Sequence, residues 1–316
     1  MTEKKITIIA PYAFGYTTHI FRALKSYNGV TPTIIYLDNP AFQYKNSLHR
    51  LQNVFSKILL DKNLKKTFVS KRILKILKYI GPQDIIFMIR PDVLDTATLK
   101  TIKTYTIDLR AYYWDSTRRF PRKVEILPFF DVLYSYDKED VEQYHLQFLT
   151  NYIFHEAKED IPATYQFFNI STNDYRLPIL ERLAAHIDSK GWSRKILVYN
   201  GSPMPVEHVT LITTQKSSEE VAELISNCSI VVEIQRAEQI GLSFRIFEAL
   251  GQRKKLITTN RDIVNYDFYR PENILVIDED NIEIPETFVN TPYLEIPEEI
   301  LAPYRVENWV QPVFSL

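Results

Sequence analysis

The apolar residues of the chain fall into short runs that alternate with amphipathic stretches. Ile6–Ala10 has the pattern of a buried strand, a helical pattern follows from about Thr17, and Thr33–Leu37 predicts a second strand that ends at Asp38. Further strands are predicted over Asp84–Ile89, Thr106–Trp114 and Val132–Tyr136, and helices over Leu94–Lys103 and Lys138–Tyr144. This alternation of strand and helix is typical of a parallel α/β sheet.

The second half of the chain repeats the alternation. Ser217, with Glu220 three positions later, is a capping-box signature and predicts that a helix begins there. Helical patterns also run through Leu180, Leu183 and Ile187 and over Ser243–Leu250. The predicted strands are Gln166–Ile170, Lys195–Tyr199, Val209–Thr213, Ser229–Ile234, Leu256–Thr259 and Ile274–Ile277. We therefore expect two Rossmann-like α/β domains, with ligands bound beyond the carboxyl ends of their strands in a cleft between them.

The polar, irregular segment Tyr152–Ala163 marks the boundary between the halves. It predicts an N-terminal domain over residues 1–155 and a C-terminal domain over residues 163–296. A length of 316 residues agrees with two domains. The tail, Pro297–Leu316, is a short amphipathic piece with three aromatic residues.

Composition narrows the classes of function. Apolar residues make up 45% and charged residues 24%, which is typical of a globular protein and excludes wholesale disorder. The net charge of −1 gives no global footprint for nucleic acid, so no nucleic-acid partner is expected. The seven glycines are scattered and form neither a P-loop nor a dinucleotide fingerprint. The single cysteine, Cys228, precedes a predicted buried strand and is expected to be an inert core thiol, in keeping with a reducing compartment.

The most informative segment is Ile234–Asn260, which reads as strand, loop, helix and strand. Gly241 permits a close turn and Ser243 is a good N-cap residue. Arg245 lies in the first helical turn, where free N–H groups favour an anion, and Glu248 follows on the same face. This arrangement suits a nucleotide diphosphate beside its ribose hydroxyls.

The same segment resembles the C-terminal half of GT-B glycosyltransferases, most of all the subgroup that serves bacterial lipopolysaccharide and capsule assembly. The shared pattern is Gly-Leu, a residue pair, Arg and Glu-Ala-Leu, here within Gly241–Leu250. The resemblance implies that Glu248 binds the donor ribose and that Gly241–Arg245, with Ser243 and Phe244, lies against the donor phosphates. It implies a nucleotide-sugar donor, a glycan or lipid-linked glycan acceptor, no cofactor and no required metal. It also implies that the tail packs back on the N-terminal domain.

A second cation, Arg236, is a candidate to neutralise the leaving diphosphate, with a surface salt bridge as the alternative. On the acceptor side, Asp115 follows a predicted strand and is the first candidate for a general base. Its alternative is a cap of the next turn. Asp137, at another strand end, and His19, at the start of the first helix, are further candidates with structural alternatives.

Aromatic residues near these strand ends are candidates to contact the acceptor sugar. They are Tyr16, Tyr113 and Trp114, and the alternative is that they fill the core. Asp278-Glu279-Asp280 matches the D-x-D pattern of metal-binding GT-A enzymes but lies late in the chain, so we expect an exposed acidic turn.

Ser56–Ile80 carries eight basic residues and a single acid, Asp61. Its apolar positions have helical spacing, so a basic amphipathic helix is predicted that either lies on an anionic bilayer or packs on the sheet with an ordinary solvated face. No stretch is long enough for a membrane span. The expected location is cytoplasmic, with possible peripheral contact to the inner face of the membrane.

Three other functions fit the sequence. A nucleotide-sugar epimerase of the same build would convert the donor without an acceptor. A non-catalytic subunit that binds sugar nucleotides is the second alternative, since a glutamate that many family members carry falls at Ile240 here. A membrane adaptor that uses Ser56–Ile80 would bind anionic liposomes but no nucleotide.

Overall fold

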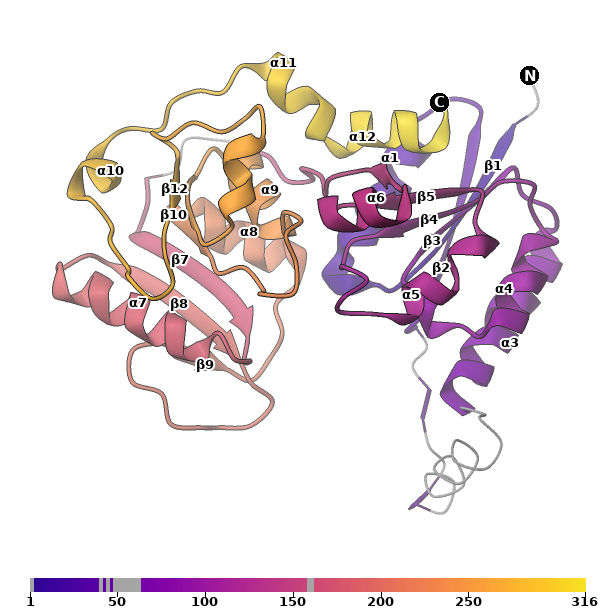
Figure 1. The fold of residues 1–316 in the computed structure, drawn as a ribbon, viewed down its shortest axis with the longest axis horizontal. Helices are drawn as coiled ribbons and strands as arrows, with labels where there is room; N and C mark the ends of the chain where they lie inside the picture. Colours follow the sequence, from indigo (N-terminus) through magenta and orange to yellow (C-terminus); the bar gives the residue numbers. More distant parts are fainter. Residues whose placement is uncertain (1–2, 40–41, 44–45, 48–63, 158–161) are drawn as a thin grey trace. The chain divides into compact units, whose positions relative to one another are not determined.

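The computed structural model describes residues 3–39, 42–43, 46–47, 64–157 and 162–316. The chain divides into two units (Figure 1). Residues 1–149 and 310–316 form the first unit, and residues 150–309 form the second. The chain therefore passes between the units twice, after Leu149 and after Trp309.

The first unit is built on a six-stranded parallel sheet with the strand order β2-β1-β3-β4-β5-β6. Its strands are β1 (Lys4–Ala10), β2 (Val30–Tyr36), β3 (Ile85–Ile89), β4 (Leu109–Tyr113), β5 (Val132–Ser135) and β6 (Gln147–Phe148). Strands β1, β3 and β4 are almost wholly buried, because helices cover both faces of the sheet. The chain order reverses between β1 and β3, so the carboxyl ends of these strands form the switch point of this sheet.

The chain of the first unit forms helices where apolar residues recur with helical spacing. They are α1 (Tyr16–Lys25), α3 (Leu64–Ile80), α4 (Thr96–Lys103), α5 (Arg122–Glu125), α6 (Lys138–Tyr144) and the second half of α12 (Val306–Phe314). Helices α3 and α4 share one apolar cluster with the sheet. Elsewhere in this unit the Phe314 ring packs against Phe87, with 5.0 Å between ring centroids. Lys4 Nζ donates to the Phe314 carbonyl at 2.7 Å, so the last residues of the chain complete this unit.

The second unit holds another six-stranded parallel sheet, ordered β12-β11-β10-β7-β8-β9. Its strands are β7 (Tyr165–Thr172), β8 (Arg194–Tyr199), β9 (Thr210–Ile212), β10 (Cys228–Glu233), β11 (Lys255–Thr258) and β12 (Ile274–Val276). Its helices are α7 (Leu177–Ser189), α8 (Ser218–Ser226), α9 (Phe244–Gly251), α10 (Glu286–Asn290) and α11 (Glu298–Leu301). The switch point of this sheet lies between β7 and β10.

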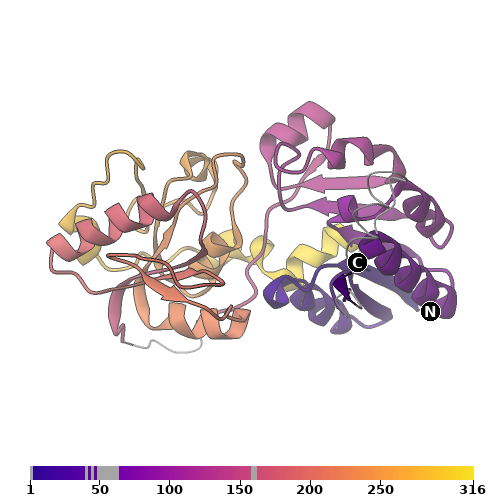
Figure 2. The ribbon, with the colours of Figure 1, turned by 90° about the horizontal axis from the view of Figure 1, so that it is seen from below.

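Two apolar clusters make up the core of the second unit. One contains residues of α7 and α10, and the other contains residues of α8 and α9. Figure 2 shows α7 and α8 on opposite sides of the sheet. Each cluster also takes side chains from the strands, so the sheet is sandwiched between helices as in a Rossmann-like domain.

The predicted fold class is confirmed as α/β, with two Rossmann-like units that each hold a six-stranded parallel sheet. The capping box at Ser217 is also confirmed, because its hydroxyl accepts from Glu220 N–H and the Glu220 carboxylate accepts from Ser217 N–H. The strand predicted from Thr106 is shorter than expected, because Thr106 makes only an isolated bridge to Gln83 before β4 begins at Leu109. The two-residue edge strand β6 was not predicted, since so short a segment has no measurable periodicity.

Candidate functional site

The switch point of the second unit gathers most of the residues predicted to bind a donor. Two loops leave the sheet there, Asn173–Arg176 after β7 and Ile234–Ser243 after β10. The second loop leads directly into α9, whose N-cap residue is Ser243. The Ser243 side chain makes no capping hydrogen bond, so the N-terminal turn of α9 keeps its backbone N–H groups uncapped by that hydroxyl.

Side-chain amides fix the main chain of this loop. Four consecutive carbonyls, Gln239–Leu242, accept hydrogen bonds from amide side chains. Gln235 Nε2 donates to the first and third at 2.9 and 3.0 Å. Asn260 Nδ2 donates to the second at 3.0 Å, and Asn151 Nδ2 donates to the fourth at 2.9 Å. The negative ends of these peptide dipoles are thus engaged by the protein, which lowers the repulsion that an anion beside the loop would meet.

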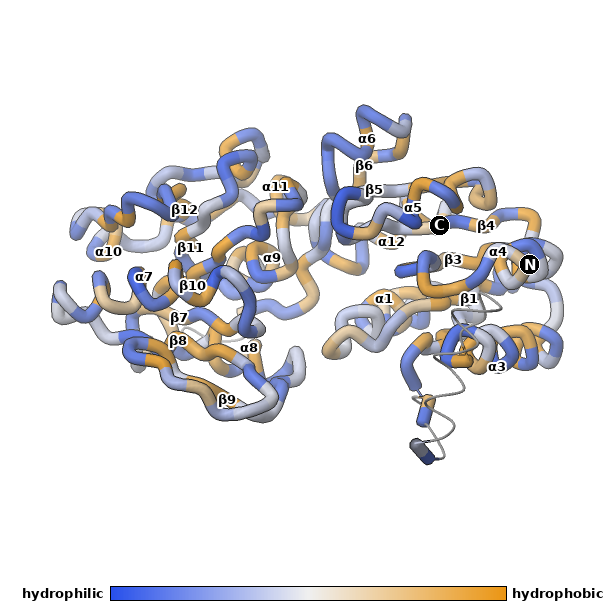
Figure 3. Tube along the Cα trace, turned by 60° about the horizontal axis from the view of Figure 1, so that its bottom comes forward, coloured by the Kyte–Doolittle hydropathy of each residue, from blue (hydrophilic) through white to orange (hydrophobic). Residues whose placement is uncertain are grey.

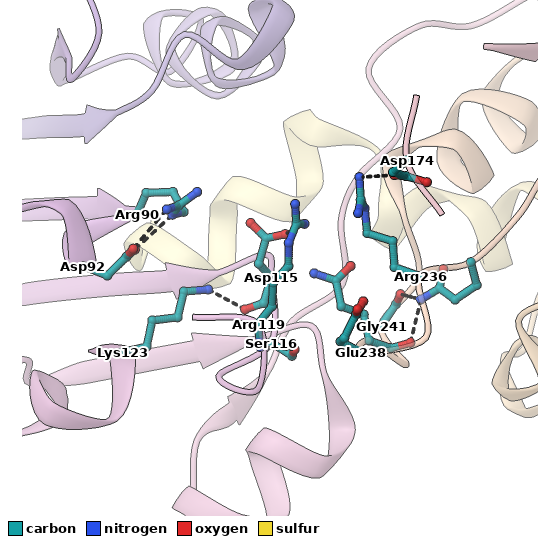
Figure 4. A network of polar contacts seen from close by, with 12 residues as sticks. Arg90, Asp92, Asp115, Ser116, Arg119, Lys123, Asp174, Arg236, Glu238 and Gly241 are labelled. Carbon is teal, nitrogen blue, oxygen red and sulfur yellow. Dashed lines mark hydrogen bonds and ion pairs between the residues drawn. The ribbon is translucent and has the colours of Figure 1, made fainter. Parts of the chain in front are cut away.

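Guanidinium groups from both loops lie at the same strand ends. Arg236 pairs with Asp174 at 2.7 Å (Figure 4). Arg176 makes a bidentate contact with the same carboxylate at 2.9 and 2.9 Å and donates to the Ile234 carbonyl at 2.7 Å. Burial acts to raise the pKa of Asp174, but hydrogen bonds from Arg176 and the charge of Arg236 outweigh it, so the pKa lies below its usual value. One carboxylate therefore holds two cations in place at the switch point.

Arg245 and Glu248 form the contact that their helical spacing predicts. Arg245 Nη1 lies 2.5 Å from a carboxylate oxygen of Glu248, and the Glu248 side chain is fully buried. Phe244 turns toward Tyr152, with 5.1 Å between the ring centroids, so its ring packs inside the second unit. Gly241 is buried, and its carbonyl is one of those held by Gln235.

Glu233 is a buried acid of this site that the sequence analysis did not identify. It ends β10, and its carboxylate accepts a hydrogen bond from the Thr258 hydroxyl at 2.7 Å. Burial raises the pKa of Glu233, against the opposing influence of Thr258 and of the charges on Arg176 and Arg245. The only signal in the sequence is an acid at the end of the apolar run Ile230–Val232.

In the first unit, Asp115 follows β4 by two residues. Its carboxylate pairs with Arg119 at 2.6 Å, and its main-chain carbonyl accepts a hydrogen bond from Lys123 Nζ (Figure 4). Ser116 is buried beside it. Both the carboxylate and the backbone of Asp115 are therefore held by cationic side chains.

Lys123 was not identified from the sequence either. The whole residue is buried, and its ammonium lies 4.7 Å from the Tyr113 ring centroid and 5.4 Å from that of Phe120. Burial lowers the pKa of Lys123 to about 8, although the nearby carboxylates, chiefly that of Asp115, oppose this. Nothing in the polar segment around Lys123 distinguishes it from a surface lysine before the fold is known.

Three other acceptor-side candidates, Asp137, His19 and Tyr113, are buried in the first unit. The Asp137 carboxylate is fully buried and caps α6 by accepting from Glu139 N–H at 3.1 Å and Asp140 N–H at 3.4 Å. His19 is buried within α1. Tyr113 lies wholly in the core and donates to the Lys123 carbonyl at 3.1 Å, which agrees with the alternative that this aromatic residue fills the core.

Two predicted features away from the strand ends, Cys228 and the Asp278–Asp280 segment, are also placed. Cys228 is buried, and burial raises the pKa of its thiol to about 12, so the thiolate is strongly disfavoured. Asp278 lies in an exposed turn, accepts from Asp280 N–H at 2.9 Å and pairs with Arg261 at 2.7 Å. Within the described ranges, no group of three or more His, Cys, Asp or Glu residues is placed to hold a metal ion.

The predicted basic helix is described from Leu64 onward as α3, and the part before it lies outside the described residues. The buried side chains of α3 are Ser70, Ile73 and Leu77, which face the sheet. The tube of α3 alternates between hydrophilic and hydrophobic residues (Figure 3). No helix in the described part of the chain has the length and apolarity that crossing a bilayer requires.

Comparison with known proteins shows the fold alone. No protein-family model and no curated protein sequence matches the chain. The chain does match solved structures. The UDP-GlcNAc 2-epimerase of Methanocaldococcus jannaschii, in complex with UDP-GlcNAc and UDP, is 11% identical with a TM-score of 0.51, and the match covers 99% of each chain. S. aureus MnaA, in a structure with UDP, is 11% identical with a TM-score of 0.57 over 100% of this chain and 98% of that one.

A third similar structure has another activity. The UDP-forming α,α-trehalose-phosphate synthase of Burkholderia vietnamiensis is 11% identical, with a TM-score of 0.52 over 98% of this chain and 95% of that one. The GT-B fold of this chain is thus shared by epimerases and by a synthase. At these identities the subgroup that serves lipopolysaccharide and capsule assembly is not distinguished.

Proposed function

We propose that the protein is a glycosyltransferase that moves a sugar from a nucleotide-sugar to a hydroxyl of a glycan or glycolipid. The observation that carries the proposal is the fixed loop Ile234–Ser243 at the switch point of the second sheet, with its four engaged carbonyls and neighbouring guanidinium groups. Such a loop, leading into the N-terminus of a helix, suits the phosphates of a nucleotide. Three structures with this fold are named for UDP or UDP-sugars, which agrees with a nucleotide-sugar donor.

Each candidate residue has a role in this proposal. Arg236 and Arg245, with the N–H groups that follow Gly241 and Ser243, offset the charge of the donor phosphates. Glu248 accepts hydrogen bonds from the ribose hydroxyls when Arg245 turns from it toward phosphate. The four-carbonyl loop needs no change for this, because its contacts come from Gln235, Asn260 and Asn151.

The first unit binds the acceptor in this proposal. The acceptor oxygen forms a bond to the anomeric carbon, and the bond between that carbon and the donor phosphate oxygen breaks. The nucleotide leaves with the electron pair, and the Asp115 carboxylate takes the hydroxyl proton. His19 contacts the acceptor, and Asp137 supports α6 at the neighbouring strand end.

The test is calorimetric binding of UDP, GDP, CMP, ADP and TDP, with and without EDTA, followed by turnover of the matching nucleotide-sugar on an acceptor panel. Arg245→Gln is expected to weaken nucleotide binding by about tenfold, since a charged hydrogen bond is lost. Arg261→Gln is the matched control, because Arg261 also pairs with a single carboxylate but its side chain is 78% exposed. Equal affinities for the two variants would refute the site. Loss of binding in EDTA would refute the absence of a required metal.

An epimerase is the second candidate, and the similarity to the UDP-GlcNAc 2-epimerase structure favours it. It predicts a new nucleotide-sugar in the absence of any acceptor, detected by proton NMR of the donor. A transferase leaves the donor unchanged until an acceptor is added. Binding without either reaction would favour a non-catalytic subunit of a polysaccharide assembly complex.

A peripheral membrane contact through α3 belongs to the same proposal. Its described residues include six basic side chains and no acid. The exposed positions Lys71, Lys75 and Lys78 lie opposite the buried face, and the Tyr79 side chain next to them is 90% exposed. Basic residues with an exposed aromatic ring suit the headgroup region of an anionic bilayer, where a lipid-linked acceptor would lie.

Co-sedimentation with vesicles tests this contact. Lys71→Gln/Lys75→Gln is expected to weaken binding to phosphatidylglycerol vesicles by about 30-fold, at about 1 kcal/mol for each charge. Lys190→Gln/Lys195→Gln, on exposed positions of the second unit, is the matched control. Equal binding by both variants, or equal binding to neutral vesicles, would remove the bilayer from the proposal.

A further inference from the structure

The loop after β1 exposes two aromatic rings at the switch point of the first sheet. Tyr12 is 45% exposed and Phe14 is 42% exposed. The loop follows the strand that lies between β2 and β3, and ligands of such sheets bind at this point. Neither ring was among the residues singled out from the sequence.

The backbone of this loop is held in an uncommon conformation. Ala13 and Phe14 have φ values of 45° and 58°, followed by Gly15 at 98°. A left-handed conformation at a residue other than glycine costs about 1 kcal/mol or more, so two in a row need support. Tyr12 N–H donates to Asp38 Oδ1 at 2.9 Å, and Gly15 N–H donates to the Tyr12 carbonyl at 2.9 Å.

The rings themselves are also positioned by neighbours. Tyr12 meets Tyr36 edge to face at 5.5 Å between centroids, and Phe14 meets Tyr16 edge to face at 6.2 Å. The Tyr36 hydroxyl is hydrogen-bonded to Thr18 Oγ1 at 2.8 Å, which fixes the ring against which Tyr12 leans. These contacts hold the two rings in place and leave Tyr12 and Phe14 half exposed.

A polar pair follows the adjacent strand. Arg90, also left-handed with φ of 61°, comes directly after β3 and makes two hydrogen bonds of 3.0 Å to Asp92. Its guanidinium lies 3.8 Å from the Phe120 ring centroid. Since β1 and β3 are parallel neighbours, this fixed polar pair and the aromatic loop occupy the same edge of the sheet.

We infer that Tyr12 and Phe14 form a binding platform for a pyranose ring, the terminal sugar of the acceptor. A pyranose presents a C–H face, which stacks on aromatic rings, and a rim of hydroxyls, which bind planar charged groups such as Arg90 and Asp92. Tyr12 and Phe14 thus take the acceptor-binding role predicted for Tyr113, which is buried in the core, and act together with Tyr16. This inference rests on the proposed transferase function, because it names the substrate class that the first unit recognises.

Saturation-transfer NMR on the full chain tests the platform directly. The probes are the methyl glycosides of glucose, galactose, mannose and N-acetylglucosamine, with saturation confined to aromatic protons. Wild-type protein is expected to transfer saturation to the C–H face of at least one glycoside. Phe14→Ala and Phe14→Leu are both expected to weaken its affinity by up to about tenfold, the size of an aromatic contact.

Phe148→Ala is the matched control, because Phe148 is also 42% exposed but lies in the edge strand β6. Glycoside signals at the wild-type level in Phe14→Leu would overturn stacking, and equal losses in Phe14→Ala and Phe148→Ala would overturn the platform. No transfer to any glycoside from wild type would also overturn it and would favour a protein partner for the exposed rings. Nucleotide calorimetry on the same samples separates the two failures, since it reports the donor site whether or not a glycoside binds.

Discussion

Lys123→Met tests whether the buried ammonium costs stability in exchange for holding Asp115. Lys123 is fully buried, and its ammonium donates to the Asp115 carbonyl beneath the strand end. Methionine has a similar length and no charge, so it fills the same space without an ion to desolvate. The substitution therefore separates the electrostatic cost of the site from its packing.

The magnitude follows from the pKa of Lys123. A change from 10.5 to about 8 makes protonation of the folded state about 3 kcal/mol less favourable than protonation of the unfolded chain. Because the unfolded chain holds this proton more tightly, wild-type stability is lowered at pH 7 and recovers as the pH rises from about 8 to about 10.5. We expect Lys123→Met to raise the free energy of unfolding by about 1–3 kcal/mol near pH 7, after the loss of one hydrogen bond is subtracted.

Urea unfolding followed by circular dichroism, from about pH 7 to about pH 10, measures this difference. The advantage of the variant should shrink toward zero across that range, since the wild-type ammonium loses its proton. Lys100→Met, at an exposed position, is the control and should stay within about 0.5 kcal/mol of wild type at every pH. A variant that is less stable by a constant amount at all pH values would refute the reasoning. Turnover by the variant should fall, because Asp115 loses its anchor.

Four further substitutions give distinct outcomes. Asp115→Asn is expected to lower turnover by about 100-fold or more with unchanged nucleotide affinity. Asp137→Asn should mainly lower the melting temperature, by the equivalent of about 1 kcal/mol of folding free energy. Similar turnover in the two variants would refute Asp115 as the base. Glu248→Gln should weaken nucleotide binding about tenfold in calorimetry, and an unchanged affinity in a folded protein would remove it from the site. Gly251→Ala should destabilise the second unit by about 1–3 kcal/mol in urea unfolding, because the new methyl group overlaps the His155 carbonyl. A variant as stable as wild type would show that the backbone there moves to accept the methyl group without cost.

The sequence carried the elements of the fold because each strand is a short apolar run bounded by turn residues. The Lys138–Tyr144 helix was predicted with the bounds that the structure has, since Asp137 is both a strand end and an N-cap. The same observation limits the functional reading, because a carboxylate that caps a helix has the same local pattern as one that takes a proton. Only the hydrogen bonds to Glu139 and Asp140 reveal the capping role of Asp137.

The rest of the candidate site could not be predicted, because it depends on contacts between residues far apart in the sequence. Asn151 reaches the Leu242 carbonyl across 91 positions of sequence, and no local pattern connects them. Lys123 and Glu233 are charged residues in the interior, where charge normally argues for the surface. Tyr12 and Phe14 were missed for the opposite reason, since aromatic residues beside a buried strand are normally expected in the core. The donor-binding roles of Arg245 and Glu248 stay predictions, although their contact is present.

The late return of the chain to the first unit has a consequence for synthesis on the ribosome. The second unit is continuous, so its whole sequence, through Trp309, is available before Val310 is added. The first unit begins at the N-terminus but needs Val313 and Phe314, both fully buried, to close its core. A nascent chain therefore exposes an incomplete first sheet until Val313 and Phe314 have been added, so the unit that is begun first is completed after the second.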